Sequence, residues 1–264
     1  MVMTLIPIKT RVITPGDDIV EIVLESLEKM GERIKNNDIL VLAETAVATA
    51  EGRVIELSKI QPSSRAFELA KKYDVTPELA ELILREADEI LGGISHVILT
   101  LKRGILIANA GIDKSNAPPG CVVLLPKDPM KTAEEVRRRI FEKTGKKIGV
   151  IIADSRTQPL RLGTIGIALG VAGFVPVSDE RGKLDIFGKP LMITRRAIAD
   201  NLASAAEILM GEAGEMVPAV LIRGAPITFT DYTINLESMI ISPEECLYMS
   251  IFKKFIKNRR IKYR

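Results

Sequence analysis

The fold class is decided by the stretch RRRIFEKTGKKIGVIIADS at residues 137–155. Its first part mixes charged and apolar residues as a surface helix does, and Gly145 is a typical C-terminal stop for that helix. The following run, Ile148 to Ala153, is apolar throughout and has the length of a buried strand. Asp154 and Ser155 are expected to end this strand. A helix that leads directly into a buried strand is typical of folds in which helices pack on a sheet.

Similar signals extend along the chain in both directions. The helix before this strand is predicted to begin at Thr132, because Thr132 and Glu135 match a capping box. Further elements are indicated by apolar periodicity and flanking Gly, Pro and Asp residues: strands at Leu5–Ile8, Asp38–Ala43 and Pro218–Arg223, helices from Asp17 to Gly31, Thr76 to Leu91 and Asp200 to Met210, and a hairpin of His96–Leu101 with Ile105–Asn109.

These elements do not alternate in the regular order of a doubly wound sheet. We therefore expect an α/β to α+β fold, with a mixed sheet packed by helices and two interwoven lobes. The sequence has no GxxxxGK(S/T) motif, and its glycines do not follow a strand in GxGxxG spacing. Both observations argue against a P-loop or Rossmann fold.

Composition restricts the class of protein further. The chain has 264 residues, of which 47% are hydrophobic, and its formal net charge of +3 predicts no nucleic-acid partner. Two cysteines, Cys121 and Cys246, do not make a disulfide framework, so a reducing cytoplasm is expected. The apolar start, Met1 to Ile8, is soon interrupted by Lys9, and no apolar stretch approaches the roughly 20 residues of a membrane span. We expect a cytoplasmic protein without a membrane partner.

Much of the positive charge lies at the C-terminal end of the chain. We expect one domain over residues 1–242, followed by a basic amphipathic tail over 243–264. A packed or solvated terminal helix is the first interpretation of this tail. Contact with a partner subunit comes second, and contact with RNA or an anionic membrane surface comes last.

His96 is the only histidine. Mechanisms in which a histidine acts as the base, with serine, cysteine or zinc, would all have to use it. It is expected on a strand without a neighbouring cysteine or second histidine, which is typical of an ordinary packed or edge residue. Zinc and triad chemistry are therefore disfavoured.

Carboxylates remain as the candidates for chemistry. Asp113 follows a strand and turn, Asp154 follows an apolar strand, and Glu212 lies in a glycine-flanked turn after a helix. Hard oxygen ligands of this kind, with the hydroxyl of Ser155, suit magnesium or manganese together with phosphate oxygens. The alternative is that Asp113 and Asp154 only complete turns and helix N-termini.

Four glycines punctuate the next apolar stretch: Gly163, Gly166, Gly170 and Gly173. They would allow a ligand to approach the backbone, but close packing of a helix or strand is the favoured interpretation.

Several motifs, taken in order, resemble the coenzyme F420-0:L-glutamate ligase family over roughly residues 5–225. The set consists of PGDDI (15–19), AEGR (50–53), NAGIDKSN (109–116), RRRIFEKTGKKIGVIIAD (137–154), DS (154–155) with Arg161 and Gly163, LMGEAGE (209–215) and PAVLIRG (218–224). The resemblance implies a ligase that uses GTP to activate the terminal carboxylate of a deazaflavin lactyl phosphate as an acyl phosphate, which the amine of L-glutamate then attacks.

The resemblance also implies cofactors, an assembly and site residues. Two divalent cations, manganese or magnesium, would act with GTP and in addition a monovalent cation, in a homodimer with small-molecule partners. No covalent nucleophile is implied. Carried over by position, the implied metal ligands are Asp113, Asp154, Ser155 and Glu212, the implied nucleotide contacts are Glu44, Thr45, Asn116, Gly211, Ala213 and Gly214, and Arg161 is an implied substrate or phosphate contact.

The chain departs from the family pattern at three positions. Glu44 stands where the family has serine, Thr49 where it has lysine, and Gln158 where it has arginine. Glu44 and Thr49 are expected to weaken the hold on a triphosphate unless Lys9 or Arg11 supplies a cation. Gln158 is expected to alter how an anionic substrate is held, although Arg156 and Arg161 remain close in sequence. Two alternatives follow: a diverged paralogue that amidates a different acid, and a non-catalytic protein of the same fold that binds a nucleotide or other ligand.

Overall fold

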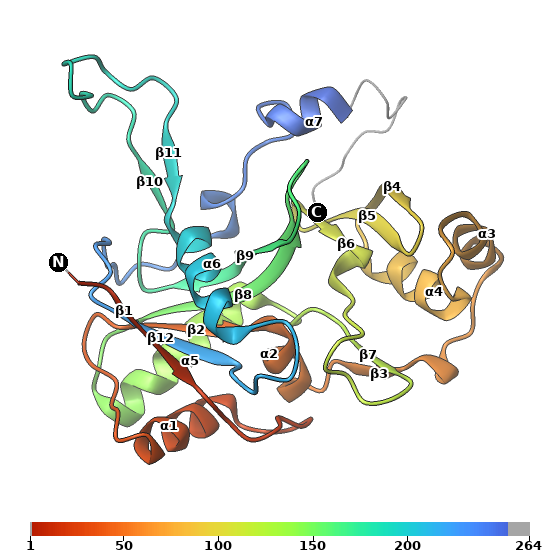
Figure 1. Cartoon of the computed structure of the whole chain (residues 1–264), viewed down its shortest axis with the longest axis horizontal. Coiled ribbons are helices and arrows are strands. Elements are labelled where there is room, and N and C mark those ends of the chain that lie inside the picture. Colours follow the sequence, from red (N-terminus) through yellow and green to blue (C-terminus); the bar gives the residue numbers. More distant parts are fainter. Residues whose placement is uncertain (1, 253–264) are drawn as a thin grey trace. The chain divides into compact units, whose positions relative to one another are not determined.

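The computed structural model describes residues 2–252, which form two compact units (Figure 1). Unit 1 comprises the residues up to 53 and residues 126–239, and unit 2 comprises residues 54–125 and those from 240 onward. Each unit is thus built from two separate segments of the chain. The prediction of two interwoven lobes is confirmed.

Unit 1 contains a mixed sheet, as predicted, and this sheet has five strands. Its strands are β1 (Thr4–Ile8), β12 (Ala219–Arg223), β2 (Ile39–Ala43), β8 (Gly149–Thr157) and β9 (Thr164–Ala172), in that spatial order. The pair β2 and β8 is parallel, and the other neighbours are antiparallel. The central strands are apolar on both sides, which indicates that both faces of the sheet are covered.

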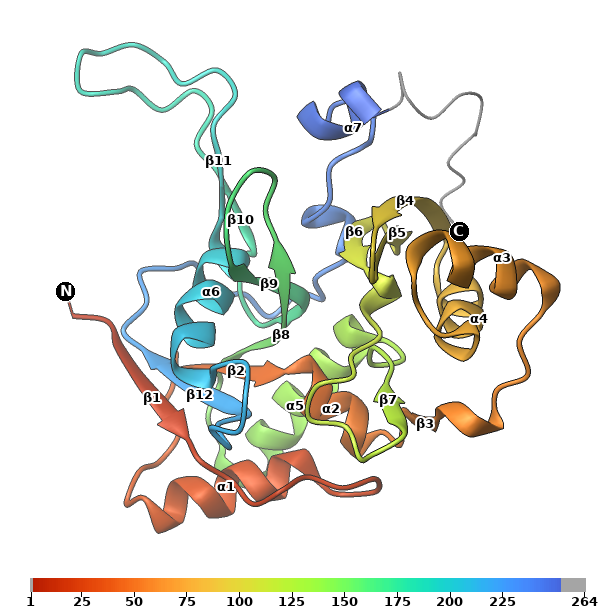
Figure 2. The same ribbon diagram turned by 45° about the vertical axis from the view of Figure 1, so that its right-hand side comes forward.

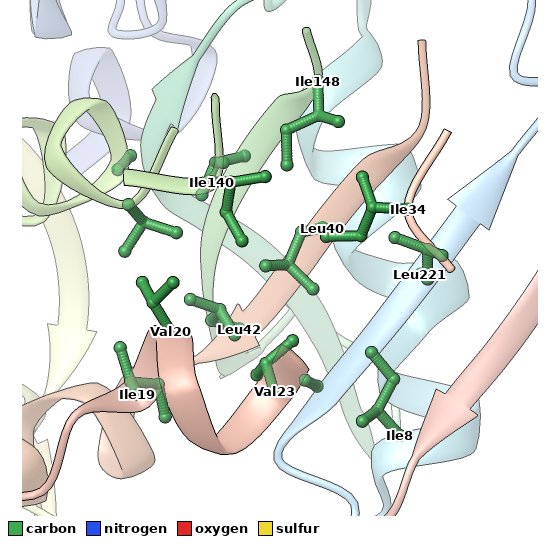
Figure 3. Packing of buried hydrophobic residues seen from close by; sticks show 14 of the residues in the cluster. Ile8, Ile19, Val20, Val23, Ile34, Leu40, Leu42, Ile140, Ile148 and Leu221 are labelled. Carbon is green, nitrogen blue, oxygen red and sulfur yellow. The ribbon is translucent and has the colours of Figure 1, made fainter. Parts of the chain in front are cut away.

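Helices cover the two faces. Helices α1 (Ile19–Lys29) and α5 (Pro129–Thr144) pack on one face, in a cluster that includes Leu40, Leu42 and Ile152. Figure 3 shows Leu40 and Leu42 in this cluster. Helix α6 (Ile198–Met210) packs on the opposite face, against Ile39, Val41, Ile151 and Ala153. A short helix, α2 (Glu44–Ala50), follows β2 directly. The alternation of side chains along each strand therefore supplies two separate cores.

The start of α5 differs from the prediction. The N-cap residue is Asp128, whose carboxylate accepts a hydrogen bond from the backbone N–H of Lys131, and Pro129 occupies the first turn. Thr132 already lies inside the helix, and its hydroxyl donates to Glu51. Gly145 ends the helix with φ of 67°, as predicted.

Strand β8 is longer than predicted. It continues through Asp154 and Ser155 to Thr157, because β9 pairs with it residue by residue to Thr157↔Thr164. Beyond Ala153, the last residue paired with β2, the strand has β9 as its one neighbour in the sheet. The two strands therefore form a ribbon that projects from the sheet.

Unit 2 is a second, smaller α/β unit. It contains helices α3 (Ser64–Tyr73), α4 (Pro77–Glu86) and α7 (Leu247–Phe252), the sheet of β4 (Glu89–Ile94), β5 (Val97–Lys102) and β6 (Ile105–Ala108), the pair β3 (Val54–Glu56) and β7 (Cys121–Val123), and 3-10 turns at Leu57–Lys59 and Asn109–Gly111. The predicted hairpin across Arg103 and Gly104 is confirmed. The helix from Thr76 ends at Glu86, not near Leu91, because the next residues pair with β5 as strand β4.

His96 does not lie on a strand. It occupies the turn between β4 and β5 with φ of 69°, and its Nδ1 atom is 2.7 Å from the carbonyl oxygen of Asp74. Of the tail, residues 243–252, which include α7, are described, whereas the basic residues from 253 onward lie outside the described residues. Nowhere in residues 2–252 does a helix have the length and apolar character needed to span a bilayer.

A long hairpin extends from unit 1, and we call residues 177–197 the arm (Figures 1 and 2). Its base is the antiparallel pair β10 (Val177–Asp179) and β11 (Arg195–Ala197). Next to the base, the buried carboxylate of Glu180 forms ion pairs with Lys183 and Arg196. Five large apolar side chains of the arm are exposed: Leu184, Ile186, Phe187, Met192 and Ile193. A patch of this kind is typical of a surface that contacts another molecule.

Stability of unit 2 is expected to depend on pH through Glu81. Hydrogen bonds from the hydroxyl and backbone N–H of Ser63, and from Arg85, lower the pKa of Glu81 from 4.5 to about 2. A depressed pKa stabilises the fold above pH 4.5, and this stabilisation is lost as the pH falls towards 2. Glu81→Gln should therefore lower the urea midpoint at pH 7, and the difference from wild type should vanish near pH 2. The exposed Glu68→Gln on α3 is the matched control; equal effects of both would contradict this account.

Candidate active site

The register of the unit 1 sheet brings four chain segments to one end of it. Ile8 pairs with Ala219, Ala219 pairs with Leu42, and Ala43 pairs with Ala153. The residues just after β1, just after β2, just before β12 and in the outer half of β8 therefore lie at the same end. This is the carboxyl end of the parallel pair β2 and β8, which is where open α/β sheets place ligand sites.

Ser155 and Glu212 meet at this end of the sheet. The hydroxyl of Ser155 lies 3.4 Å from Oε2 of Glu212, and the hydroxyl of Thr164 donates to Oε1 at 2.9 Å. Ser155 and Thr164 belong to the β8–β9 ribbon, whereas Glu212 follows α6. The structure thus places two of the four sequence-predicted metal ligands in contact, and Thr164 joins them.

Asp154 lies on the other face of the ribbon, since successive side chains of a strand point to opposite sides. Its Oδ1 atom accepts a hydrogen bond from the backbone N–H of Ser155 at 2.7 Å. Arg156 shares its face, and the buried Nε atom of Arg156 has no hydrogen-bond partner within residues 2–252. A buried donor without an acceptor is unfavourable, so this face is suited to an anionic ligand.

Glu207 lies beside the contact of Ser155 with Glu212 but was not predicted from sequence. It lies in the last turn of α6, and its carboxyl is close to Glu212, Thr164 and Gly166. Burial and the neighbouring Glu212 raise the pKa of Glu207. Its Oε1 atom is buried and, within the described chain, has no hydrogen-bond partner.

This donor set fits a hard divalent cation. Two carboxylates in contact repel each other unless a proton or a cation lies between them, and the two hydroxyls of Ser155 and Thr164 are further oxygen donors. Residues 2–252 hold no group of three or more His, Cys, Asp or Glu side chains that is gathered as a metal centre. The fit therefore rests on the pair Glu207 and Glu212 with the two hydroxyls.

The predicted nucleotide contacts in unit 1 also come to this end. Glu44 follows β2, is only 6% exposed, and accepts a hydrogen bond from the hydroxyl of Thr45 at 2.7 Å. The backbone N–H of Ala43 donates to the carbonyl of Pro218, which places Glu44 beside the segment that leads into β12. A buried acidic side chain thus stands at one of the predicted nucleotide contacts.

The glycine turn before β12 is closed by one of its own side chains. The backbone N–H of Ala213 donates to the carboxylate of Glu215 at 2.8 Å. Gly211 has φ of 69°, and a Cβ atom there would lie 2.3 Å from the carboxyl carbon of Glu215. The carboxylate of Glu215 therefore already accepts the hydrogen bond of the Ala213 N–H. Backbone N–H groups of this kind also bind phosphate oxygens.

Two cations follow β1 and were predicted as substitutes for the missing lysine. Arg11 forms a two-pronged ion pair with Asp17, which lowers the pKa of Asp17. Lys9 makes no ion pair within residues 2–252. Because the backbone N–H of Thr10 donates to the carbonyl of Met216, Lys9 lies in a segment next to the turn at residues 211–215.

Asp113 and Asn116 belong to unit 2. The backbone of Asp113 bridges to Val123, and its carboxylate accepts a hydrogen bond from the backbone N–H of Ser115 at 2.8 Å. Asn116 is exposed and has φ of 54°. Within its own unit, Asp113 therefore has the turn-forming contact that sequence analysis gave as the alternative to metal binding.

The glycine series is explained mainly by packing. A Cβ atom would lie 2.5 Å from the backbone of Ala203 at Gly166, 2.1 Å from Pro129 at Gly170, and 2.4 Å from Ile148 at Gly173. Gly163 is different, because it has open space around it and φ of 102° in the loop between β8 and β9. Three of the four glycines thus allow close contact between elements, which agrees with the favoured interpretation.

The fold and the site define the chain as a mixed α/β protein with oxygen donors and cations placed for charged small molecules. The family model described as F420-0:gamma-glutamyl ligase matches residues 7–224. A coenzyme F420:L-glutamate ligase of Methanothermobacter thermautotrophicus is 44% identical over 212 residues, covering 80% of this chain and 84% of the relative. A protein of the same name from Methanopyrus kandleri is 45% identical and covers 81% of this chain and 83% of the relative. Another, from Archaeoglobus fulgidus, is 38% identical and covers 92% of this chain and 94% of the relative. The chain belongs to the F420-0:gamma-glutamyl ligase family and is an enzyme of the ligase class.

Proposed function

We propose that this ligase uses GTP to join L-glutamate to the terminal carboxylate of the deazaflavin coenzyme precursor F420-0. The relatives are named coenzyme F420:L-glutamate ligases and match along most of their own length, which supports the substrates. The observation that carries the proposal is the convergence of Ser155, Thr164, Glu207 and Glu212 at the carboxyl end of β2 and β8.

The reaction has two steps. A carboxylate oxygen of F420-0 attacks the γ-phosphorus of GTP, the bond to the β-phosphate oxygen breaks, and an acyl phosphate and GDP form. The amine of L-glutamate then attacks the acyl carbon, loses a proton and releases inorganic phosphate, which leaves an amide. Neither step requires an enzyme nucleophile, so the solitary His96 in a turn of unit 2 is no obstacle.

Divalent cations bound here would neutralise part of the charge of the triphosphate. Ser155 and Glu212, with Thr164 and Glu207 beside them, would hold one cation on the α6 face of the ribbon. Asp154 would serve a second cation on the opposite face, and Asp113 is carried over from the family pattern as a further ligand. Manganese and magnesium both suit such oxygen donors.

Cationic residues of unit 1 support the binding of the triphosphate. Lys9 lies beside the turn at residues 211–215 and is uncommitted within the described residues, whereas Arg11 is held by Asp17. Arg156 presents a buried, unpaired N–H on the face of Asp154. For the Ala213 amide to bind a phosphate oxygen, the carboxylate of Glu215 must first move away.

A homodimer is part of the proposal. The arm carries large exposed apolar side chains at its end, and the ion pairs of Glu180 hold its base in shape. Removal of such a surface from water stabilises association. Light scattering of the wild-type protein should therefore give the mass of two chains.

One observation favours a second candidate function, the amidation of a different acid. Glu44 is buried at the carboxyl end of β2, where the family pattern gives a serine, and this larger acidic side chain changes the contacts that the site offers to a ligand. Gln158 adds to this departure, because it stands in the β8–β9 loop where the family pattern has an arginine. The substrate would then be a less anionic acid, with the same use of nucleotide and metal.

An omission experiment tests the proposal. Wild-type protein should release phosphate from GTP with manganese, L-glutamate and F420-0 together, and omission of any single component should reduce release to background. The product should gain the mass of one glutamate residue. Full release with another acid in place of F420-0 would favour the second candidate, and no release with any acid would contradict both.

A further inference from the structure

The loop between β8 and β9 has a composition that packing inside the protein does not explain. It comprises residues 158–163 and joins strands whose last pair is Thr157↔Thr164. Leu160 and Leu162 are both fully exposed, with a relative accessibility of 105% each. Arg161 lies between them, and its guanidinium makes no ion pair within residues 2–252. Two exposed leucines beside an uncommitted cation form a small surface that is apolar and positive at once.

The backbone of this loop is also strained. Leu160 has φ of 58°, a left-handed conformation that a leucine rarely adopts and that costs about 1 kcal/mol or more. The backbone N–H of Arg161 donates to the carbonyl of Gln158, which holds the turn closed. Strained backbone conformations are found more often at ligand-binding positions than elsewhere in proteins.

The position of the loop links it to the active site. The β8–β9 ribbon leaves the sheet after Ala153 and extends for the four residues Asp154 to Thr157, as Figure 2 shows for the hairpin. At about 3.3 Å per residue, the loop lies roughly 13 Å beyond the end of the sheet. The same ribbon carries Ser155 and Thr164, which contact Glu212. The distance from this contact to the loop is therefore fixed by paired strands.

We propose that Leu160, Arg161 and Leu162 form the part of the site that recognises the acceptor, with the leucines against its flat ring system and Arg161 near its anionic phosphate. The inference rests on the proposed function, in which the reacting carboxylate and the ring lie at opposite ends of one molecule. With the carboxylate near Ser155 and Glu212, a ring directed away from the sheet along the ribbon would lie against the loop. An apolar and anionic ligand is complementary to the two leucines and the arginine.

The test compares acceptor binding by wild type and by the double variant Leu160→Ser/Leu162→Ser. Calorimetric titration with F420-0 alone should show a Kd raised about tenfold or more, because the ring loses apolar cover. The KM values for GTP, manganese and L-glutamate should stay within twofold of wild type. Arg161→Gln should also weaken F420-0 binding, and its effect should shrink as salt concentration rises.

A matched control replaces two other exposed apolar residues, in Ile94→Ser/Leu247→Ser, which should leave the Kd for F420-0 unchanged. Because Leu160 and Leu162 are fully exposed, the loop variant should melt at the temperature of wild type. Light scattering should give the same solution mass for both; a lower mass for the loop variant would assign the leucines to a subunit contact and overturn the inference. An unchanged Kd for F420-0, or a KM for GTP raised as strongly, would overturn it as well.

Failure of this inference can be separated from failure of the proposed reaction. Wild-type protein that binds F420-0 but forms no amide would contradict the reaction, while the loop variant would still decide the inference from the Kd. Wild-type protein that forms amide with a different acid and does not bind F420-0 would contradict this assignment of the leucines.

Discussion

Glu212→Gln is expected to reduce amide formation about a hundredfold or more. This should be the largest catalytic effect of any single change among Ser155, Thr164, Glu207 and Glu212. The variant keeps the size of the side chain and removes its negative charge. Glu212 accepts hydrogen bonds from Ser155 and Thr164 and lies close to Glu207, so its carboxylate connects these oxygen donors. The measurement is kcat for phosphate release together with the manganese concentration that gives half activation.

The manganese requirement distinguishes a ligand role from a structural one. If Glu212 contacts the cation, half activation should move to a manganese concentration at least tenfold higher. Glu28→Gln is the control, since Glu28 is an exposed residue of α1. Wild-type activity of Glu212→Gln at every manganese concentration would remove Glu212 from the site.

Gly170→Ala is expected to destabilise unit 1 by about 3 kcal/mol, which is a large effect for the addition of one methyl group. Gly170 is buried in β9, and a Cβ atom there would lie 2.1 Å from the carbonyl oxygen and 2.3 Å from the carbonyl carbon of Pro129. Pro129 is the first residue of α5, so the methyl group would push that helix away from the sheet. Urea denaturation gives the change in the free energy of unfolding.

Gly92→Ala is the control for this substitution. Gly92 also lies in a strand, β4, but a Cβ atom there has no neighbour within 4 Å. Its free energy of unfolding should therefore stay within about 1 kcal/mol of wild type. Equal destabilisation by the two variants would show that strand propensity, not contact with α5, explains the effect at Gly170.

The sequence predicts the central elements of the fold well, because their signals are local. The apolar run that became β8 and the stop at Gly145 are visible in a short window. The continuation of β8 through Asp154 and Ser155 was not predicted, because polar residues extend a strand only when a distant partner such as β9 pairs with them. The helix predicted to reach Leu91 ended early for the same reason, since pairing of β4 with β5 outweighed helical periodicity.

The structure brings some of the predicted site residues together and adds one that was not predicted. Family motifs pointed to Ser155 and Glu212, and their contact agrees with a shared role. Glu207 was missed because its burial beside Glu212 depends on the close approach of α6 to Gly166, where the hydroxyl of Ser204 donates to the Gly166 carbonyl. The series Gly163, Gly166, Gly170 and Gly173 indicated close packing in this stretch. The series does not indicate which residue of another element packs against each glycine.

The central claim is that the chain forms an amide through an acyl phosphate of the acceptor. F420-0 labelled with heavy oxygen in its terminal carboxylate tests this claim directly, in a reaction with GTP, manganese and L-glutamate followed by mass spectrometry. We expect one heavy oxygen in the released phosphate and a product heavier by one glutamate residue, because the carboxylate oxygen that attacks phosphorus leaves with it. Unlabelled phosphate, or phosphate release without the glutamate mass gain, would contradict the account.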